Sequence, residues 1–257
     1  MSAGASSAKS LSRARSGMET GFAAKMMREN HRVARRVALG ALDMTVDSAG
    51  GVWIESERTL IVSDLHLEKG SSFARRGSLV PPYDTGATLA QLTAMIARWS
   101  PRRVVALGDS FHDQDGPGRL SQNDASALSA LQAGRDWLWI AGNHDPSPPA
   151  GLAGDAAFET MIGDVVLRHE PSLRDERPQI AGHLHPCVVV RGGGRGVRRR
   201  CFAVDRRTLV MPALGAYSGG LDLFHRAFAG LFDHASLVAH VMGDGGLFSF
   251  PAAALRE

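Results

Sequence analysis

Five short apolar segments of this chain each lead into Asp, Asn or His, and this pattern limits what the chain can fold into. Each segment reads as a buried strand followed by side chains able to bind a metal ion. A carboxylate at the edge of a core is costly unless a cation or hydrogen bonds compensate for its lost hydration. In open α/β sheets, ligands gather outside the carboxyl ends of the strands. The segments are LIVSDLH, VVALGD, WLWIAGNHD, VVLRHE and QIAGHLH.

Periodicity predicts an α/β fold class. Apolar residues at helical spacing predict helices over 84–99, with Asp84 as N-cap, and over 124–133. Their alternation with strands predicts a parallel sheet, whereas the later strands leave little room for helices and are expected to be antiparallel. The whole is expected to be a two-sheet β-sandwich flanked by helices, with a metal site at the C-terminal ends of the strands. The expected strands are 52–54, 59–63, 104–107, 136–142, 165–167, 179–181, 188–190, 201–204 and 208–211, with a final hairpin over 237–250.

Length and composition restrict the class further. The 257 residues suffice for one large domain, and no run of about 18 apolar residues predicts a membrane span. Cys187 and Cys201 are the only cysteines, which excludes a disulfide framework and a CxxC metal knuckle. Two cysteines fit a reducing compartment, so we expect a cytoplasmic protein without a membrane partner.

Charge is distributed in patches. Residues 1–44 hold eight Lys or Arg against three acidic residues, and we expect them to be a disordered basic tail before a domain at 45–257. A short basic helix within 22–42 and a transit peptide are the alternatives. The segment 191–207 holds seven arginines against Asp205, although the rest of the domain is acidic.

The residues at the strand ends form a mixed nitrogen and oxygen ligand set. A lone histidine at a strand end is more often a hydrogen-bonded boundary residue than a ligand, but five such segments occur in order. Seven ligands are too many for one tetrahedral zinc ion and suit two divalent ions bridged by a shared carboxylate. The predicted ligands are Asp64, His66, Asp109, Asn143, His169, His183 and His185.

The order D-x-H, GD, GNHD, a lone His and GHxH resembles the calcineurin-like metallophosphoesterase superfamily. Longer strings across residues 50–225 resemble its bacterial ligase-associated DNA-damage-response endonuclease branch. These strings are SDLHLEKGSSFARRG, PPYDTGATL, GDSFHD, GNHDP, RHEP, AGHLHP and MPALGAYSGGLD.

This resemblance implies a metallophosphoesterase-type sandwich and assigns roles to the residues. His144 is implied as the group that donates a proton to the leaving oxygen, with Asp145 holding its ring. Two divalent ions are implied, with manganese favoured and iron, zinc or cobalt as alternatives. The implied ligands are Asp64, His66 and His185 for one ion and Asn143, His169 and His183 for the other, with Asp109 as the bridge.

Basic residues near these motifs are candidates for binding substrate. Arg75 and Arg76 could hold a phosphate, and His112 follows the bridging Asp109, although a solvated loop explains them about equally well. Arg198, Arg199 and Arg200 belong to RGGGRGVRRR, which we expect to be a flexible hairpin that contacts DNA phosphates, with a partnerless basic loop as the alternative. Glu68 and Lys69 are interpreted as surface residues.

Three functions are compatible with these features. The first is a two-metal phosphodiesterase, a DNA endonuclease acting in repair, with an ATP-dependent ligase and a helicase as partners implied by the resemblance. The second is a phosphodiesterase or phosphatase for a small nucleotide. The third is a non-catalytic scaffold on the same fold. The complete ligand set favours catalysis, and the arginine-rich segment favours a nucleic acid.

Overall fold

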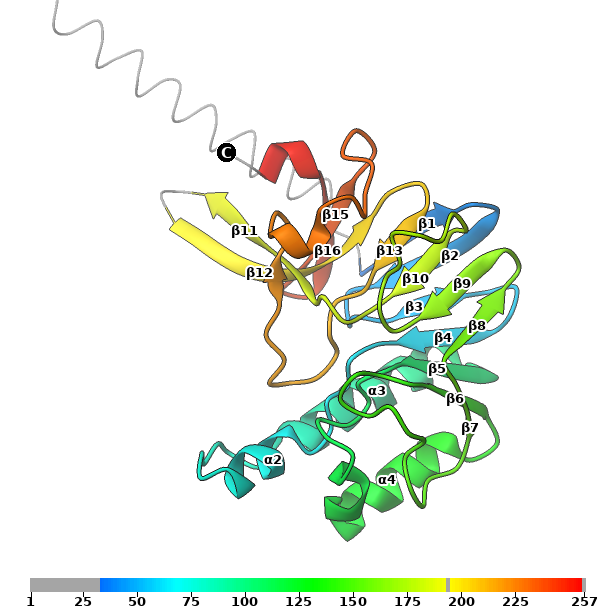
Figure 1. Cartoon of the computed structure of the whole chain (residues 1–257), viewed down its shortest axis with the longest axis vertical. Helices are drawn as coiled ribbons and strands as arrows, with labels where there is room; N and C mark the ends of the chain where they lie inside the picture. The colour runs from blue at the N-terminus through cyan, green and yellow to red at the C-terminus, as the bar shows by residue number, and fades with distance from the viewer. Residues whose placement is uncertain (1–32, 193–194, 256–257) are drawn as a thin grey trace, which may run out of the picture.

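A computed structural model describes residues 33–192 and 195–255, whose strands form two sheets packed face to face (Figure 1). In the first sheet the strands follow one another in chain order from β1 to β7. These strands are β1 (Ala34–Leu39), β2 (Leu42–Asp47), β3 (Val52–Ile54), β4 (Thr59–Val62), β5 (Arg103–Leu107), β6 (Asp136–Ile140) and β7 (Asp155–Ala157).

The second sheet has the order β14-β11-β12-β13-β10-β9-β8, and β15 joins it by pairing with both β12 and β16. The long strands β11 and β12 form an antiparallel ribbon that projects from the body (Figure 1). The strands are β8 (Glu159–Ile162), β9 (Val165–Arg168), β10 (Gln179–Ala181), β11 (Pro186–Gly192), β12 (Arg195–Val204), β13 (Thr208–Val210), β14 (Leu221–Asp222), β15 (Val238–Gly243) and β16 (Gly246–Pro251).

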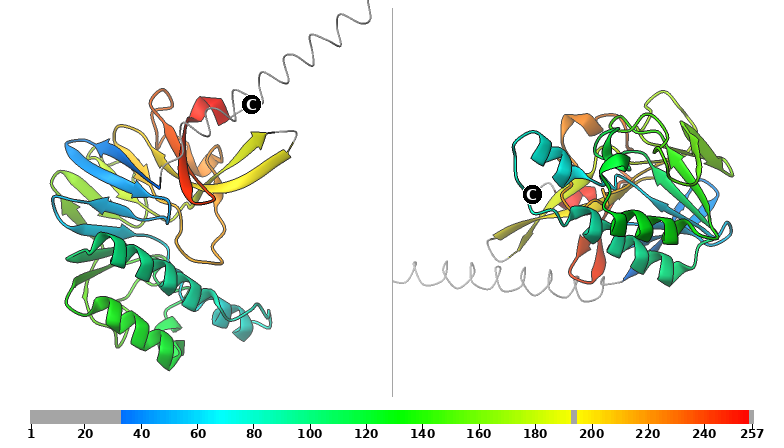
Figure 2. Two further views of the ribbon diagram at one scale, coloured as in Figure 1. Left: turned by 180° about the vertical axis from the view of Figure 1, so that it is seen from behind. Right: turned by 90° about the horizontal axis from the view of Figure 1, so that it is seen from below.

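Helices α3 (Asp84–Trp99) and α4 (Gln122–Gln132) cover the outer face of the first sheet (Figure 2). The bounds of α3 agree with the prediction, but Asp84 is its first helical residue and Tyr83 occupies the N-cap. The Asp84 carboxylate accepts a hydrogen bond from the Gly70 amide at 2.9 Å, so it ties α3 to the first turn of α2 (Lys69–Arg75). The remaining helical segments are α2 (Lys69–Arg75), η1 (Gly116–Arg119), η2 (Arg226–Phe228) and η3 (Ala252–Leu255).

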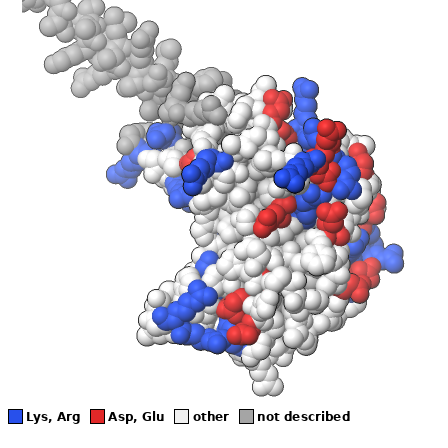
Figure 3. Space-filling view, viewed as in Figure 1, with Lys and Arg blue, Asp and Glu red and all other residues white. Residues whose placement is uncertain are grey.

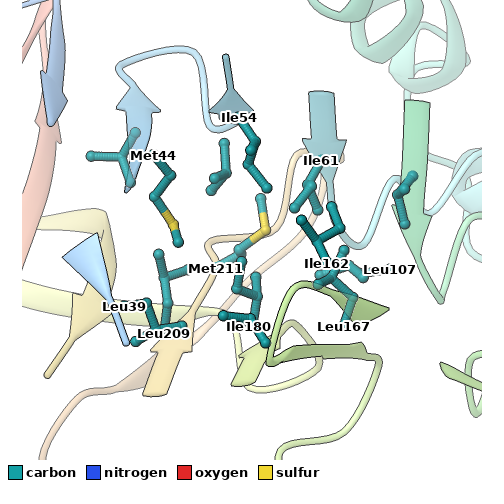
Figure 4. Close-up of a cluster of buried hydrophobic side chains, with 14 of the residues drawn as sticks. Leu39, Met44, Ile54, Ile61, Leu107, Ile162, Leu167, Ile180, Leu209 and Met211 are labelled. Carbon is teal, nitrogen blue, oxygen red and sulfur yellow. The ribbon is translucent and has the colours of Figure 1, made fainter. Parts of the chain in front are cut away.

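The main core lies between the two sheets, where apolar side chains from both inner faces interdigitate (Figure 4). Its members are fully or almost fully buried, so each contributes roughly 1.5–3 kcal/mol of apolar transfer free energy. Residues from the two sheets in this core include Leu39, Met44, Ile54, Ile61, Leu107, Ile162, Leu167, Ile180, Leu209 and Met211.

Strand direction places the predicted ligands together. Strands β4, β5 and β6 are mutually parallel, so their carboxyl ends share one edge of the first sheet. In the second sheet β9, β10 and β13 are also parallel, and the expectation of an antiparallel second half is therefore wrong for these three. The loop 169–178 returns the chain to the start of β10, which short spacing alone did not indicate. The hairpin of β15 and β16 is confirmed.

The expected domain boundary at residue 45 is too late. Strands β1 and β2 form an antiparallel pair and join the first sheet through β3, so residues 34–44 belong to the domain. The short basic helix that was the alternative within 22–42 is wrong where it overlaps β1, and residues 1–32 lie outside the described residues. No helix in the described ranges is long and apolar enough to cross a membrane.

Candidate metal centre

The loops that follow β4, β5, β6, β9 and β10 bring all the predicted ligands to one place. His185 Nε2 lies 3.0 Å from Asp64 Oδ1, and His169 Nε2 lies 3.4 Å from Asp109 Oδ1. His66 Nε2 is 3.9 Å from Asp109 Oδ2, so the Asp109 carboxylate lies between His66 and His169. The donors of one sheet thus meet those of the other.

Three groups of donor atoms have the spacing that a metal ion requires, and two of them consist of predicted ligands alone. One set is Asp64, His66 and His185, and within it the ligand atoms all lie within 4.8 Å of one another. The other, with the same limit, is Asp109, His169 and His183. Asn143 joins the second set, because its Oδ1 lies 3.0 Å from His169 Nε2. These sets match the two ion sites that the motif resemblance implied.

The donor chemistry of the second set fits a cation. His169 Nδ1 lies 2.9 Å from the Leu107 carbonyl and must donate to it, because a carbonyl only accepts. Its Nε2 faces Asn143 Oδ1 and Asp109 Oδ1, and His183 Nδ1 lies 3.2 Å away. Such a convergence of imidazole nitrogens with amide and carboxylate oxygens is the mixed donor set that binds divalent metal ions. A carbonyl partner on the far ring nitrogen is also the usual support for a histidine ligand.

The buried donor groups of the first set also fit a cation. Both ring nitrogens of His66 are buried without a hydrogen-bond partner among the described residues. Burial lowers the pKa of His66 to about 2, so its ring is neutral, the form that binds metals. Asp64 is fully buried, which disfavours its charge, yet the neighbouring His185 and His169 rings lower its pKa below the usual value.

Two glycines of the motifs allow this close convergence. A Cβ at Gly182 would collide with the side chains of Ser63 and Asp64 from the first sheet. A Cβ at Gly142 would collide with the backbone of Asp109. The glycines in GNHD and GHLH are therefore required by packing between the ligand loops.

His144 lies beside the cluster but is held differently from the prediction. Its Nδ1 is 2.8 Å from the carbonyl of His112, so that carbonyl orients the ring. The expectation that Asp145 holds the ring is wrong: Asp145 Oδ2 accepts from the Phe111 amide at 3.0 Å. Burial raises the pKa of Asp145 to about 7, and the Asp109 charge adds to the effect although the Phe111 amide opposes it.

His112 belongs to the cluster. Its ring stacks on that of His144 with centroids 4.9 Å apart, and it meets the His66 ring edge-on at 5.5 Å. The ligand atoms of these three histidines lie within 4.8 Å of one another. Burial and the nearby Lys69 ammonium lower the pKa of His112 to about 4.

The predicted phosphate-binding arginines lie on opposite rims of a hollow. Figure 3 shows this hollow between Lys and Arg side chains of the β11–β12 ribbon above and of the α2 region below. Arg75 and Arg76 are exposed at the end of α2, and Arg75 pairs with Asp115 at 3.0 Å. On the ribbon, Arg198 donates to the Gly220 carbonyl and Arg199 lies 3.5 Å from Asp244.

Arg200 has a structural role in place of the predicted phosphate contact. Its guanidinium donates to the carbonyls of Ala213 at 2.9 Å, Gly215 at 3.0 Å and Ser218 at 3.2 Å. These bonds fasten the loop 213–220 to the base of the ribbon. The same loop contacts the centre, because the Gly215 amide donates to the Asp64 carbonyl at 3.0 Å.

The interpretation of Glu68 and Lys69 as surface residues is wrong. Glu68 is buried, and its carboxylate accepts from Thr85 Oγ1 at 3.0 Å. Lys69 is half-buried; burial lowers its pKa, whereas the charges of Asp109 and Asp84 raise it. Their place directly after the D-x-H ligands was the available signal for a role near the site.

Comparison with known proteins identifies the fold. No family model matches the chain, and no curated protein matches it by sequence. The structure is similar to the crystal structure of nuclease MPE from Pseudomonas putida, with a TM-score of 0.68 and 24% identity. That alignment covers 84% of this chain and 100% of the nuclease.

Two weaker similarities have TM-scores too low to establish a shared fold. One is to Yfce, a phosphoesterase from E. coli, with a TM-score of 0.34 and 16% identity over 63% of this chain and 83% of that chain. The other is to a Vps29 single mutant from Entamoeba histolytica, with a TM-score of 0.31 and 16% identity over 75% and 96%. The match to the nuclease shows that the chain shares the fold of that protein, and the ordered ligand motifs at its strand ends are those that resemble the calcineurin-like metallophosphoesterases.

Proposed function

We propose that the chain is a two-metal phosphodiesterase that cleaves DNA as an endonuclease. The convergence of donors from five strand ends carries this proposal, because it unites buried, unpartnered imidazole nitrogens with carboxylates. The fold shared with a nuclease supports it. The role in repair, the ligase and helicase partners and the preference for manganese rest on the motif resemblance, whereas the cytoplasmic location rests on the low cysteine count.

The ligands divide between the two ions as the two sets of donor atoms do. Asp64, His66 and His185 would hold one ion, and His169, His183 and Asn143 the other, with the Asp109 carboxylate between them. When bound, two divalent ions supply positive charge that polarises a phosphate and makes water more acidic. Hydrolysis of this kind requires no nucleophilic side chain, and both Cys187 and Cys201 are buried.

His144 is suited to act as a general acid. Because Nδ1 donates to the His112 carbonyl, the ring presents Nε2 toward Asp109, 3.9 Å from its Oδ2. The side chain is 37% exposed, so a substrate can reach it. A protonated His144 would then donate from Nε2 to the oxygen that leaves phosphorus.

DNA is favoured over a small nucleotide by the charge around the hollow. Arginines line the ribbon on one rim, and Lys69, Arg75 and Arg76 lie on the other (Figure 3). A polymer has phosphates along its whole length to contact both rims, whereas a mononucleotide has phosphate at only one end. Phosphate contacts of this kind are insensitive to base sequence.

The test is hydrolysis by protein stripped of metal and then reloaded with manganese. Its substrates are an aryl phosphodiester, the matching monoester, and single-stranded, nicked and gapped DNA. We expect metal-dependent turnover of the diester and of DNA. Asp109→Asn and His183→Ala should each lower both activities at least about 100-fold, because even changes to partners of metal ligands cost about 10- to 100-fold. His234→Ala is the matched control, since His234 is exposed outside the centre.

The outcomes separate the candidate functions. Diester turnover without DNA cleavage would replace DNA by a small phosphodiester. Faster turnover of the monoester would indicate a phosphatase. Full activity of Asp109→Asn with its metal removed would contradict the two-metal assignment, and no turnover with manganese, iron, zinc or cobalt would favour a scaffold.

A further inference from the structure

The chain contains two tyrosines, and the structure attaches both to one carbonyl on the rim of the hollow. The Tyr217 hydroxyl donates to the Pro81 carbonyl at 2.7 Å. The Tyr83 amide donates to the same carbonyl at 2.9 Å. Residues separated by more than a hundred positions are thereby held at one point, between α2 and α3 on one side and the loop 213–220 on the other.

Both tyrosine side chains are open to solvent. Tyr83 is 72% exposed and Tyr217 is 37% exposed, and their neighbour Leu79 is 88% exposed. These three are among the eight large apolar side chains exposed in the described ranges. Exposed apolar side chains gathered at one place mark a binding surface more often than scattered ones do. The hydrogen bonds of Tyr83, with Pro81 and with Ala87, use its backbone and leave the exposed ring without a polar role in the fold.

The same rim is fastened to the metal centre from two directions. On the side of Tyr217, the Leu221 amide donates to the His185 carbonyl at 3.1 Å. On the side of Tyr83, Thr85 Oγ1 accepts from the Glu68 amide at 2.9 Å, two residues beyond the ligand His66. A group bound on this rim therefore lies next to the loops that carry the ligands.

We propose that Tyr83 and Tyr217 form a stacking site for an unpaired nucleobase beside the phosphodiester that is cleaved. This inference rests on the proposed nuclease function and adds a subsite to it. An aromatic ring stacks on any base, because every base has a π-face. Arg75 and Arg76 lie on the same rim, where they can contact the phosphates on either side of that base. The apolar area, three side chains edged by arginines, suits a base better than a protein partner.

The experiment compares ring-removing with ring-keeping substitutions in the full chain. Tyr83→Leu and Tyr217→Leu, singly and together, remove the rings, whereas Tyr83→Phe and Tyr217→Phe keep them. Three substrates are assayed with manganese present. They are a single-stranded oligodeoxynucleotide, the same oligonucleotide with an abasic position beside one phosphodiester, and an aryl phosphodiester. Binding of both oligonucleotides is also measured in EDTA by fluorescence anisotropy.

We expect each Leu substitution to raise KM for the intact oligonucleotide about tenfold with little change in kcat, since stacking on an aromatic ring contributes about this much per base. Cleavage of the aryl diester should not change. The abasic oligonucleotide should bind the unsubstituted protein weakly and respond little to the Leu substitutions. The Phe substitutions should behave like the unsubstituted protein, because a loss with Tyr217→Phe would assign the effect to the hydroxyl.

Equal effects on the intact and abasic oligonucleotides would overturn the stacking site. Unchanged DNA parameters in the double Leu variant would also overturn it and leave the rim as a protein-docking surface. If no substrate is hydrolysed but binding in EDTA depends on the base and on both rings, the proposed catalytic function fails and the stacking site stands. If hydrolysis is normal but binding and KM do not depend on the base, the stacking site fails and the proposed catalytic function stands.

Discussion

At the scale of single residues, the centre is built on backbone that most residues avoid. Five predicted ligands adopt positive φ angles between 43° and 65°. A non-glycine residue in this left-handed region costs roughly 1–2 kcal/mol, and such strain concentrates at functional sites. The sequence does not indicate this backbone strain, because the ligand chemistry requires Asp and His where the backbone alone would favour glycine. The five are Asp64, His66, Asp109, His183 and His185.

At His66, whose φ is 43°, this strain predicts that a glycine variant is more stable than an alanine variant, the reverse of the usual order. Without metal, His66→Gly should be about 1 kcal/mol more stable than His66→Ala, because only alanine retains a Cβ in the left-handed conformation. Urea unfolding in the presence of a chelator measures the difference. The matched pair is His169→Gly and His169→Ala, at a ligand without positive φ, where glycine should be the less stable. The same order at both positions would contradict the argument from strain.

At the scale of elements, the β11–β12 ribbon shows how far a charged segment can be interpreted from its sequence. The arginines and glycines predicted a flexible hairpin, yet Val189 pairs with Arg198 and Cys187 with Arg200 in a regular antiparallel register. Facing residues share a side of the ribbon, so Arg198 and Arg200 lie on one face and Arg199 on the other. The three consecutive valines of β11, Val188, Val189 and Val190, were the signal for a strand. The different roles of Arg198, Arg199 and Arg200 can be assigned only from their tertiary contacts.

The ribbon should therefore respond differently to substitution along its length. Arg198→Ala with Arg199→Ala should weaken DNA binding and lower the slope of log affinity against log salt by up to about 2, at about 0.9 per lost phosphate contact. Hydrolysis of an aryl diester should not change. Arg206→Ala with Arg226→Ala, which removes two exposed arginines outside the ribbon, is the charge-matched control. Equal losses on DNA and aryl diester would place these arginines in the catalytic centre.

Arg200→Ala should act on stability instead, because it leaves several loop carbonyls without their donor. A loss of about 2 kcal/mol in the free energy of unfolding is expected. Chemical denaturation of this variant beside the Arg198 and Arg199 variant distinguishes the two roles. No change in stability would mean that the loop 213–220 holds its position without the guanidinium.

The elements that periodicity predicted well are those with strong local patterns. The bounds of α3 and β10 agree with their predictions, since apolar spacing and flanking turn residues define both. Strand β1 was missed because its paired arginines resemble a disordered basic tail, although Val37 and Leu39 pack toward the core. Parallel pairing of β9 with β10 was missed because the connection is a loop, where a helix is usual. Pairing direction depends on where the chain returns, which local sequence does not encode.

At the scale of the whole molecule, the centre lies where the two sheets meet. Asp64, Asp109 and Asn143 follow strands of the first sheet, whereas His169 and His183 follow strands of the second. Each of the two sets made of predicted ligands contains residues from both sheets. Motif order predicted that these residues meet, because each follows an apolar strand, but it did not reveal that two sheets share the site. Metal bound here would cross-link the sandwich.

Metal binding should therefore stabilise both sheets together. At a free manganese concentration 100 times Kd, one site adds about 2.7 kcal/mol to the free energy of unfolding, which raises Tm by about 5–10 °C for a chain of this size. Calorimetry with and without EDTA measures this shift, and it should be largely lost in Asp109→Asn and kept in His234→Ala. Hydrogen exchange should slow at the carboxyl ends of β4 and β5 and also of β9 and β10, because both sheets hold the same ions. Protection confined to the first sheet would mean that His169, His183 and His185 do not bind the metal, which would leave one ion at most and remove the basis for a two-metal reaction.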